Sequence, residues 1–490
     1  MAGRSQPVLA GVVTALVGFA SSFTVVLAGL RAVGASDAQA ASGLLAVCVA
    51  SGISAVWLGL RHRIPMSVAW STPGAALLVA TGTVPGGWPV AVGAFLVSGA
   101  LIVAAGLFPA LGRAVAAIPR PIAGAMLAGV LLPLCTAPVR ALVEVPRLAV
   151  PVVLAWLLLH RFARRWAVPG ALVVAVAAIA LTTPVSGLGG ARLLPAVELT
   201  APAWDLSAMV GLALPLFLVT MAAQNVPGMA VLVGYGYRPP FGAALRATGL
   251  TTVLAAPAGG HAVNLAAITA ALAAGPDAHP DPDRRWIASV TAGTGLALLG
   301  LGAGAATALV ALAPPVLIEA VAGLALLGAL ATALTSALAE PADREAAVVT
   351  FVVTASGVTL LGVGGAFWGL VAGGVMLLLF RRRSGGPTAP EPPPEPAATE
   401  SPGPAVEPVT TGAPGPAVEP VTTASPGPAA EPVTTGAPGP AVEPATSGAP
   451  GPAVEPATSG SAGPTETGRV GVTPRAAGRG PGRRGVPGRR

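Results

Sequence analysis

Hydrophobic positions form a series of long runs between residues 8 and 381, separated by short polar or Arg-containing stretches. Many of these runs extend over about 17–25 residues, the length at which a helix crosses the hydrocarbon core of a bilayer. The pattern predicts an all-α polytopic membrane protein with about fourteen transmembrane segments. The expected segments are 8–30, 39–60, 66–82, 88–111, 119–138, 146–160, 167–183, 206–224, 241–256, 259–275, 286–312, 315–338, 345–363 and 365–380.

The third and tenth segments differ from the others because Gly and Pro interrupt them. Residues 71–77 read Ser-Thr-Pro-Gly-Ala-Ala-Leu, and residues 257–265 read Pro-Ala-Gly-Gly-His-Ala-Val-Asn-Leu. Non-helical backbone at membrane depth is tolerated where it lines a cavity or is buried in protein, and paired breaks of this kind point to the binding site of secondary transporters. We expect both segments to be short and discontinuous, each with an extended stretch followed by a half-helix.

The membrane unit, residues 1–383, divides into two repeats of seven segments at about 8–183 and 206–381. An odd number of segments per repeat makes the second repeat inverted relative to the first. Weak internal similarity agrees, since Pro121–Leu132 (PIAGAMLAGVLL) aligns with Pro315–Leu326 (PVLIEAVAGLAL). We therefore expect two inverted repeats.

Residues 384–490 differ sharply in composition and are rich in Pro, Gly, Ala, Thr and Glu. A 12-residue unit, Pro-Gly-Pro-Ala-Val-Glu-Pro-Val-Thr-Thr-Gly-Ala, recurs through this region and has no hydrophobic face. Such a sequence does not bury a core. It predicts a disordered tail whose Arg-rich end contacts anionic lipid headgroups, or one that serves only as a solubilising spacer.

Charge supports the membrane assignment and orients it. Charged residues make up 10% of the chain and mean hydropathy is +0.76, whereas soluble domains carry roughly 25% charged residues. The net charge of +7 comes from Arg, and most Arg residues flank hydrophobic runs, so we expect no nucleic-acid partner. Arg is concentrated in alternate loops, which predicts a multi-pass protein of the cytoplasmic membrane with both termini cytoplasmic. The cytoplasmic set is Arg61, Arg63, Arg113, Arg120, Arg161, Arg164, Arg165, Arg238, Arg284, Arg285, Arg344 and Arg381 to Arg383.

Several functional classes lack support in the sequence. The chain contains no GxxxxGK[ST] motif for nucleotide phosphates and no Ser/His/Asp arrangement for catalysis, so we expect neither an ATP-driven pump nor an enzyme. Cys48 and Cys135 fall inside membrane segments and indicate packing residues rather than a disulfide or a metal site. Asp277, Asp281 and Asp283 surround His279 in a Pro-rich stretch that we interpret as a solvated loop. No cofactor or metal is expected.

The two breaks have the composition of an anion site. The start of a helix carries unpaired N–H groups and a partial positive charge, so two such starts bind an anion without a buried Arg. Ser71 and Thr72 precede a Pro that suits the first helical turn, and Gly74 leaves room for a ligand beside the backbone. In the tenth segment Gly260 has the same role, and His261 and Asn264 are expected one helical turn apart. The alternative is that both breaks serve helix packing alone.

Further polar and aromatic residues are candidates for the same site. Gln224 and Asn225 stand at the end of the eighth segment before a Pro-Gly break, where they either hold a substrate carboxylate or fix a neighbouring helix. The matching stretch of the first segment offers Phe23 as a contact for an aromatic ring, with Trp70 and Phe217 as further candidates.

Two ionisable residues lie within predicted segments, where such residues are costly and often functional. His261 exchanges a proton near neutral pH and is a candidate for proton coupling. Glu319, about one turn after Pro315, is either a second proton carrier or a residue that reaches water near a helix end.

These residues belong to stretches that resemble the BenE family of benzoate/proton symporters. The matching stretches are Trp70–Leu77 (WSTPGAAL), Arg120–Gly129 (RPIAGAMLAG), Thr220–Met229 (TMAAQNVPGM) and Pro257–Ala266 (PAGGHAVNLA). The resemblance covers about residues 8–381 and excludes the tail. It implies a distant relationship to nucleobase and sulfate permeases, with a core of segments 1–4 and 8–11 that moves against a gate of segments 5–7 and 12–14. It also implies Ser71 to Gly74 and Gly260 to Asn264 as site elements.

The expected function is proton-coupled uptake of benzoate or a similar aromatic carboxylate by alternating access. Nucleobase permeases carry acidic residues where this chain has Gln224, Asn225 and His261, which suits an anionic substrate. The partners expected are the aromatic carboxylate, protons and membrane lipid, and a homodimer is left open. The alternatives are transport of another small anion or a nucleobase-like ring compound, an anion channel, and a membrane scaffold that uses the tail for docking.

Overall fold

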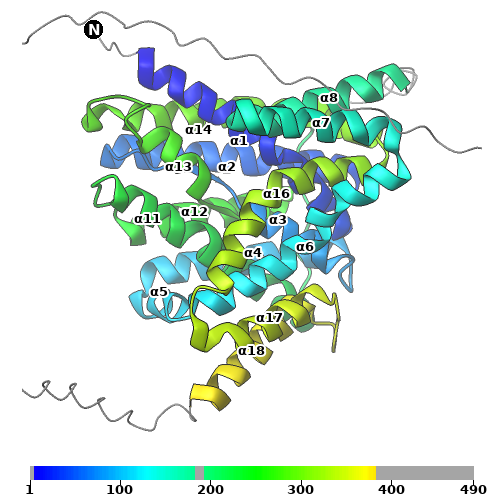
Figure 1. Ribbon diagram of the computed structural model, residues 1–490. Coiled ribbons are helices and arrows are strands. Elements are labelled where there is room, and N and C mark those ends of the chain that lie inside the picture. The colour runs from blue at the N-terminus through cyan, green and yellow to red at the C-terminus, as the bar shows by residue number, and fades with distance from the viewer. Residues whose placement is uncertain (1–4, 183–192, 382–490) are drawn as a thin grey trace, which may run out of the picture. The chain divides into compact units, whose positions relative to one another are not determined.

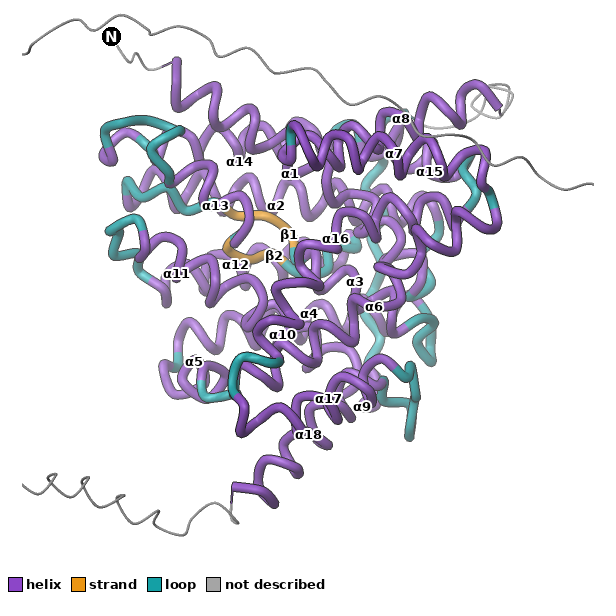
Figure 2. Tube along the Cα trace, in the orientation of Figure 1, coloured by secondary structure: helices purple, strands orange, loops and turns teal. Residues whose placement is uncertain are grey.

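Nearly all of the regular structure is helical, and the exceptions among the described residues are two strands of three residues each. The computed structural model describes residues 5–182 and 193–381, so the tail predicted at 384–490 lies outside the described residues. Figure 1 labels the helices along the chain, and Figure 2 shows the two strands among them. A mainly helical protein is what the hydrophobic pattern predicts.

The described residues of the first half form eight α-helices and one strand. The second helix shows how local sequence defines a helix end: the Ser36 hydroxyl accepts from the Gln39 N–H, and the Gln39 side chain accepts from the Ser36 N–H. The elements of this half are α1 (Ser5–Ala32), α2 (Asp37–His62), β1 (Val68–Trp70), α3 (Thr72–Thr81), α4 (Trp88–Leu107), α5 (Pro109–Ala116), α6 (Arg120–Glu144), α7 (Pro146–Phe162) and α8 (Ala167–Thr182).

The second half begins at Asp205, whose carboxylate caps the first helical turn. The hydroxyl of Ser207 and the N–H of Ala208 donate to this carboxylate and hold its pKa below the usual value. The elements are α9 (Leu206–Ala208), α10 (Leu214–Thr220), α11 (Val226–Gly234), α12 (Phe241–Ala255), β2 (Val263–Leu265), α13 (Ala267–Ala274), α14 (Trp286–Gly300), α15 (Ala303–Ala311), α16 (Pro315–Ala337), α17 (Arg344–Ala355) and α18 (Gly365–Arg381).

Seven of the described helices are long and apolar enough to cross a membrane. The stretch Pro282–Gly300, which contains α14, and α15 together form an eighth candidate that is bent by 55°. The chain is therefore a multi-pass membrane protein. The remaining predicted segments contain shorter helices, and in the third and tenth an extended stretch comes before the helix.

The eighth segment is longer than predicted. Helical structure continues from Leu206 to Gly234, whereas the sequence suggested an end near residue 224. The Val226-Pro-Gly stretch was expected to break the helix, and that expectation is wrong. Gln224 and Asn225 consequently lie in the middle of a long helix rather than at its end.

A widened helical turn explains why Pro227 does not end this helix. Proline has no N–H to donate, and its ring crowds the carbonyl four residues earlier. The backbone forms a π-helical turn at Met221–Asn225, just before Pro227, and a second one at Met209–Ala213, just before Pro215. A π turn shifts the hydrogen-bond register by one residue and lets the helix continue past each proline.

Three other boundaries differ from the prediction. The segment expected at 88–111 ends at Leu107, because Phe108 is extended before Pro109 and a separate helix, α5, follows. The segment expected at 119–138 continues to Glu144 despite two internal prolines. The segment expected at 345–363 ends at Ala355 and is followed by a turn that contains a short bridge between Leu360 and Val363.

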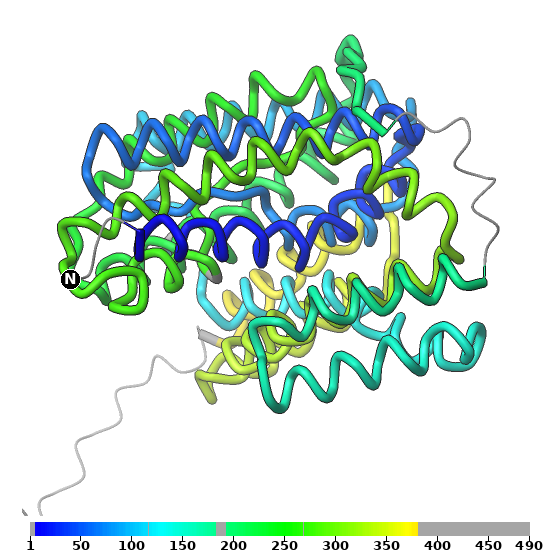
Figure 3. Tube along the Cα trace, turned by 90° about the horizontal axis from the view of Figure 1, so that it is seen from above, coloured from blue at the N-terminus to red at the C-terminus, as the bar shows by residue number. Residues whose placement is uncertain are grey.

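The most extensive helix contacts join the two halves of the chain. α6 packs on α16, α2 on α14 and α4 on α12, and Figure 3 shows blue helices of the first half beside green helices of the second. Small residues permit this close approach. A methyl group added to Gly52 on α2 would lie 2.6 Å from the carbonyl oxygen of Gly293 on α14. The halves therefore interlock rather than form separate bundles.

Candidate functional site

The two short helices α3 and α13 are each preceded by a strand, and the two strands pair with each other. β1 and β2 are antiparallel, with Val68 opposite Leu265 and Trp70 opposite Val263. This pairing gives each extended stretch hydrogen-bond partners where a membrane offers none. Segments three and ten therefore have the expected extended stretch and short helix (Figure 2).

The helix of the tenth segment begins later than predicted. It starts at Ala267, so His261 and Asn264 lie before the helix rather than in its first turn. The expectation that these two residues are one helical turn apart is wrong. The reason is that side chains from other segments accept the N–H groups of Val263 and Leu265, which a helix would have bonded to its own carbonyls.

Ser71 caps the start of α3 as the sequence predicts. Its hydroxyl accepts a hydrogen bond of 3.0 Å from the N–H of Gly74. Its own N–H donates to the carbonyl of Ala262 at 2.9 Å, which ties the cap to the other extended stretch. Thr72 is the first residue of the helix and Pro73 follows it. The positive end of α3 is thus buried beside β2.

Gln224 and Asn225 hold the start of α13. The side-chain oxygen of Asn225 accepts from the N–H of Leu265 at 2.9 Å, and that of Gln224 accepts from the N–H of Ala267 at 3.3 Å. The sequence left open whether these two amides hold a substrate carboxylate or fix a neighbouring helix. In the structure both side-chain oxygens fix the neighbouring segment.

His261 and Asn264 carry buried polar atoms without protein partners. Both side chains are fully buried. The Nε2 atom of His261 lies 3.1 Å from the carbonyl oxygen of Ser71. A carbonyl only accepts, so Nε2 carries the hydrogen and Nδ1 is left as an acceptor. Within the described residues, neither Nδ1 of His261 nor either amide atom of Asn264 has a hydrogen-bond partner. Buried polar atoms without a protein partner call for another one, such as a ligand or an ordered water.

Aromatic side chains gather beside β1. Phe23 stacks on Phe19 with ring centroids 5.1 Å apart, and Phe19 meets the Trp70 ring edge-on at 6.0 Å. The indole N–H of Trp70 donates to the hydroxyl of Ser22, so this group is fixed to α1. Phe217, the other predicted ring contact, packs in a different core cluster around Ile102 and Met221.

A small cavity lies between α1, β1, α13 and α14. Trp70, Gly18 and Leu296 form part of its wall together with Ser67, whose buried hydroxyl has no partner among the described residues. The cavity adjoins the aromatic group through Trp70. The other predicted site residues do not line it.

Gly74 and Gly260 are required by contacts within the protein. A methyl group on Gly74 would lie 2.7 Å from both a Leu216 methyl group and the Ser71 hydroxyl. On Gly260 it would lie 2.7 Å from the Cβ atom of Ala255. The missing side chains therefore make room for neighbouring protein atoms on these sides, and close approach of a ligand remains a prediction.

Glu319 lies in an ion pair with Arg140. The carboxylate of Glu319 on α16 is 3.1 Å from a guanidinium nitrogen of Arg140 on α6, and the two side chains are 34% and 50% exposed. This partly exposed pair bridges the two helices rather than reaching the strands. Among the described residues, no group of three or more His, Cys, Asp or Glu side chains has the arrangement of a metal site.

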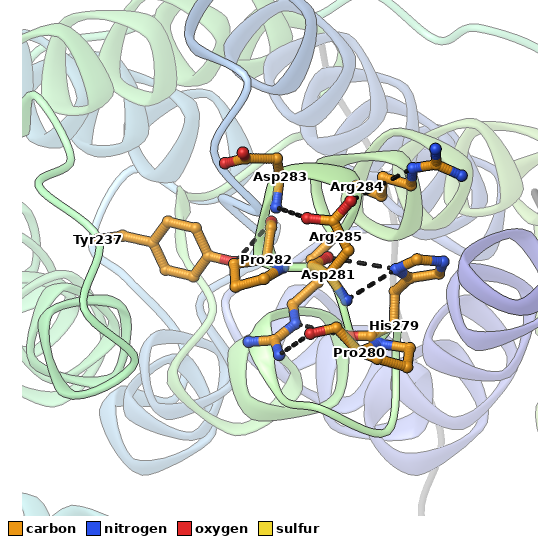
Figure 4. Close-up of polar contacts among 8 residues, drawn as sticks. All are labelled: Tyr237, His279, Pro280, Asp281, Pro282, Asp283, Arg284 and Arg285. Carbon is orange, nitrogen blue, oxygen red and sulfur yellow. Dashed lines mark hydrogen bonds and ion pairs between the residues drawn. The ribbon is translucent and has the colours of Figure 1, made fainter. Parts of the chain in front are cut away.

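The Pro-rich loop between α13 and α14 is only partly the solvated loop that the sequence suggested. Its Asp side chains are exposed, but Arg285 is buried and 7% exposed. The Arg285 guanidinium donates to the carbonyls of His279, Ala274 and Pro280 at 2.7, 2.9 and 3.2 Å, and the Tyr237 hydroxyl donates to Pro282 (Figure 4). Because Ala274 ends α13, Arg285 anchors the far end of the short helix.

We expect Arg285→Met to lower the free energy of unfolding by about 2 kcal/mol, because buried carbonyls lose charge-assisted hydrogen bonds. Arg284→Met is the matched control. Its side chain is 53% exposed and pairs only with Asp281, so a change within about 0.5 kcal/mol is expected. Thermal unfolding in detergent measures both, and equal unfolding temperatures for the two variants would contradict the anchoring role.

Two threonines are site residues that sequence reasoning missed. Thr220 donates to the Ser71 hydroxyl at 2.9 Å, and Thr252 accepts from the N–H of Val263 at 2.9 Å. Threonine is common in membrane helices, where its hydroxyl usually bonds to its own helix, so neither residue stands out in the pattern. The available signal was the position of Thr220, one helical turn before Gln224.

The match to known proteins covers the whole membrane unit. The family model described as benzoate membrane transport protein, BenE, matches residues 3–379. Inner membrane protein YdcO of Escherichia coli is 40% identical over 369 residues, which are 75% of this chain and 94% of that protein. A benzoate membrane transport protein of Acinetobacter baylyi is 32% identical over 370 residues, 74% of this chain and 92% of its own.

Among solved structures, SLC26A9 has a similar fold, with a TM-score of 0.51 at 13% identity over 76% of this chain and 65% of the other. The apolar helices, the paired half-helices and these relatives define a multi-pass membrane transport protein rather than an enzyme. The chain belongs to the BenE family.

Proposed function

We propose that this protein is a secondary transporter of the cytoplasmic membrane that takes up benzoate, or a similar aromatic carboxylate, together with protons. The observation that carries the proposal is the pair of buried half-helix starts with unpartnered polar atoms of His261 and Asn264 beside them. Helix starts attract a carboxylate, and the adjacent rings of Phe19, Phe23 and Trp70 suit an aromatic ring. The names of the family and of the Acinetobacter relative agree with this substrate.

The substrate carboxylate has several donors in this proposal. Ser71 and the N–H of Thr72 face it from one half, beside Gly74, whose own N–H is taken up by the Ser71 cap. The Gln224 amide nitrogen and the Asn264 amide face it from the other, near Gly260. Asn225 supports the second half-helix through Leu265.

Alternating access requires two bodies that move against each other. We assign fourteen segments in two inverted repeats, with a core of α1–α4 and α9–α15 and a gate of α6–α8 and α16–α18. The contacts support this division, since α2 packs on α14 and α4 on α12 within the core, while α6 packs on α16 and α17 within the gate. The Arg distribution in the loops supports cytoplasmic termini.

His261 is the residue to which we assign the coupling proton. Its Nδ1 atom is an unpaired acceptor next to the half-helix starts. A proton there adds a positive charge that favours a bound carboxylate, which links proton binding to anion binding. Glu319 is a weaker candidate because Arg140 already neutralises its carboxylate.

Uptake of radiolabelled benzoate into proteoliposomes, with and without an inward proton gradient, tests the proposal. We expect accumulation above the external concentration when the gradient is present and slow equilibration when it is absent. Equilibration alone under both conditions indicates a channel. Transport of another anion or ring compound without benzoate uptake keeps the carrier and discards the substrate.

A further inference from the structure

Thr220 uses its hydroxyl differently from three other buried threonines of the membrane helices. Thr14, Thr248 and Thr252 each donate to the carbonyl four residues earlier in their own helix, at 2.7, 3.0 and 2.8 Å. Thr220 on α10 is fully buried, and its hydroxyl donates at 2.9 Å to the hydroxyl of Ser71, which is 149 residues away in the sequence. The Thr220 hydroxyl therefore links the eighth segment to the third.

The hydrogen bonds at Ser71 determine whether its hydroxyl can donate to a ligand or accept from one. A serine hydroxyl has one hydrogen to donate and two lone pairs that accept. The Ser71 oxygen accepts from the Gly74 N–H at 3.0 Å and from the Thr220 hydroxyl at 2.9 Å. Both lone pairs are therefore occupied. In the part of the chain that the structure describes, no group accepts the remaining hydrogen.

We propose that Thr220 is a positioning residue that makes the Ser71 hydroxyl an obligatory hydrogen-bond donor to the substrate carboxylate. The inference rests on the proposed function and adds the residue that selects for the anionic form of the ligand. Thr220 acts through Ser71 and does not itself contact the substrate.

Selectivity follows from the direction of this hydroxyl. A carboxylate offers only acceptors, so it matches a Ser71 hydroxyl that only donates. A neutral amide of the same shape offers an N–H on one side, which meets no free lone pair on Ser71. Loss of the Thr220 hydroxyl frees one lone pair and lets Ser71 either donate or accept. The preference for benzoate over benzamide should then fall.

Thr220 also belongs to the segment that holds the other half-helix. Gln224 and Asn225 follow within the adjacent π turn and bond to Ala267 and Leu265. One long helix thus contacts both half-helix starts through side chains one turn apart. Substitution at Thr220 changes the first contact and leaves the second intact.

The test compares Thr220→Val, which removes the hydroxyl, with Thr220→Ser, which keeps it. For Thr220→Val we expect the KM for benzoate uptake to rise roughly fivefold, the value of the one neutral hydrogen bond that fixes the direction of the Ser71 hydroxyl. We also expect benzamide to compete better relative to benzoate than it does with the wild type. Thr220→Ser should restore both values. A purely structural role instead lowers the unfolding temperature and leaves the selectivity ratio unchanged, which overturns the proposal.

A double substitution with Ser71→Ala separates an indirect role from a direct one. Because Thr220 acts through Ser71, adding Thr220→Val to Ser71→Ala should change the KM no further. Effects that multiply would overturn the proposal, since they show that Thr220 acts on the substrate independently. Failure of the wild-type protein to take up benzoate counts against the proposed function. An unchanged selectivity ratio in Thr220→Val beside an active wild type counts against Thr220.

Discussion

Proteoliposomes that contain His261→Gln are expected to exchange benzoate across the membrane but to lose the accumulation driven by an inward proton gradient. A Gln amide can still donate to the Ser71 carbonyl that Nε2 of His261 contacts at 3.1 Å. It does not take up a proton near neutral pH, as imidazole does. The substitution therefore removes the titratable atom while it retains the hydrogen bond between the two extended stretches.

Two assays on the same vesicles make this prediction specific. Exchange of labelled for unlabelled benzoate reports binding and movement of the loaded carrier, whereas gradient-driven accumulation reports coupling. His160→Gln is the control, because that exposed histidine on α7 stacks on Trp156 away from the strands. Gradient-driven accumulation by His261→Gln at the wild-type level would remove His261 from the coupling mechanism.

Asn225→Leu is expected to reduce uptake to the level of protein-free liposomes and to lower the free energy of unfolding by about 2 kcal/mol. The side-chain oxygen of the fully buried Asn225 is the partner of the Leu265 N–H. Leucine has a similar size but cannot accept this bond, so β2 is left with an unpaired buried donor. The start of α13 then loses its fixed position relative to α3.

The matched control for this substitution is Met221→Leu, one turn earlier. Met221 contributes only a weak sulfur contact of 3.4 Å to the Asn225 amide, so that variant should fold and transport nearly as the wild type does. Thermal unfolding in detergent and benzoate uptake are measured for both. Normal transport by Asn225→Leu would show that the Asn225 bond does not position the site.

Much of the helical architecture is readable from residue type and spacing. The runs around residues 8–30 and 315–338 consist of apolar residues over a membrane-spanning length, and both are single helices. Ser71, followed by Thr72 and Pro73, has the composition of a helix start, and the Ser71 hydroxyl does cap α3. These features depend on neighbours within a few residues, which the sequence displays directly.

Errors arose where distant side chains decide the local conformation. Residues 262–266 contain helix-compatible Ala and Val, yet they are not helical because Ser71, Thr252 and Asn225 bond to their backbone. Pro227 resembles a helix end, yet a π turn carries the helix past it. At the first place the competing partners lie in other segments, and at the second the shifted backbone bonds of the π turn have no signature in residue type, so local propensity gave the wrong answer.

The candidate site also contains some residues that the sequence identifies and others that only the structure identifies. His261, Asn264, Gln224 and Asn225 are polar residues in apolar surroundings, and this contrast alone identifies them. Thr220 and Thr252 lack that contrast, because a threonine hydroxyl in a membrane helix can bond to a carbonyl of its own helix, as that of Thr248 does. Their role emerges only when the distance from Thr220 to Ser71 is known.

The sequence by itself determined that this protein is a multi-pass membrane transporter of the BenE type with two interrupted segments, because bilayer thickness and helix-breaking residues act through local patterns. Tertiary structure alone decided which buried polar atoms satisfy each other and which are left for a ligand. Each hydroxyl, amide and imidazole has several possible partners, and only the packing of segments one, two, three, eight, nine and ten selects among them.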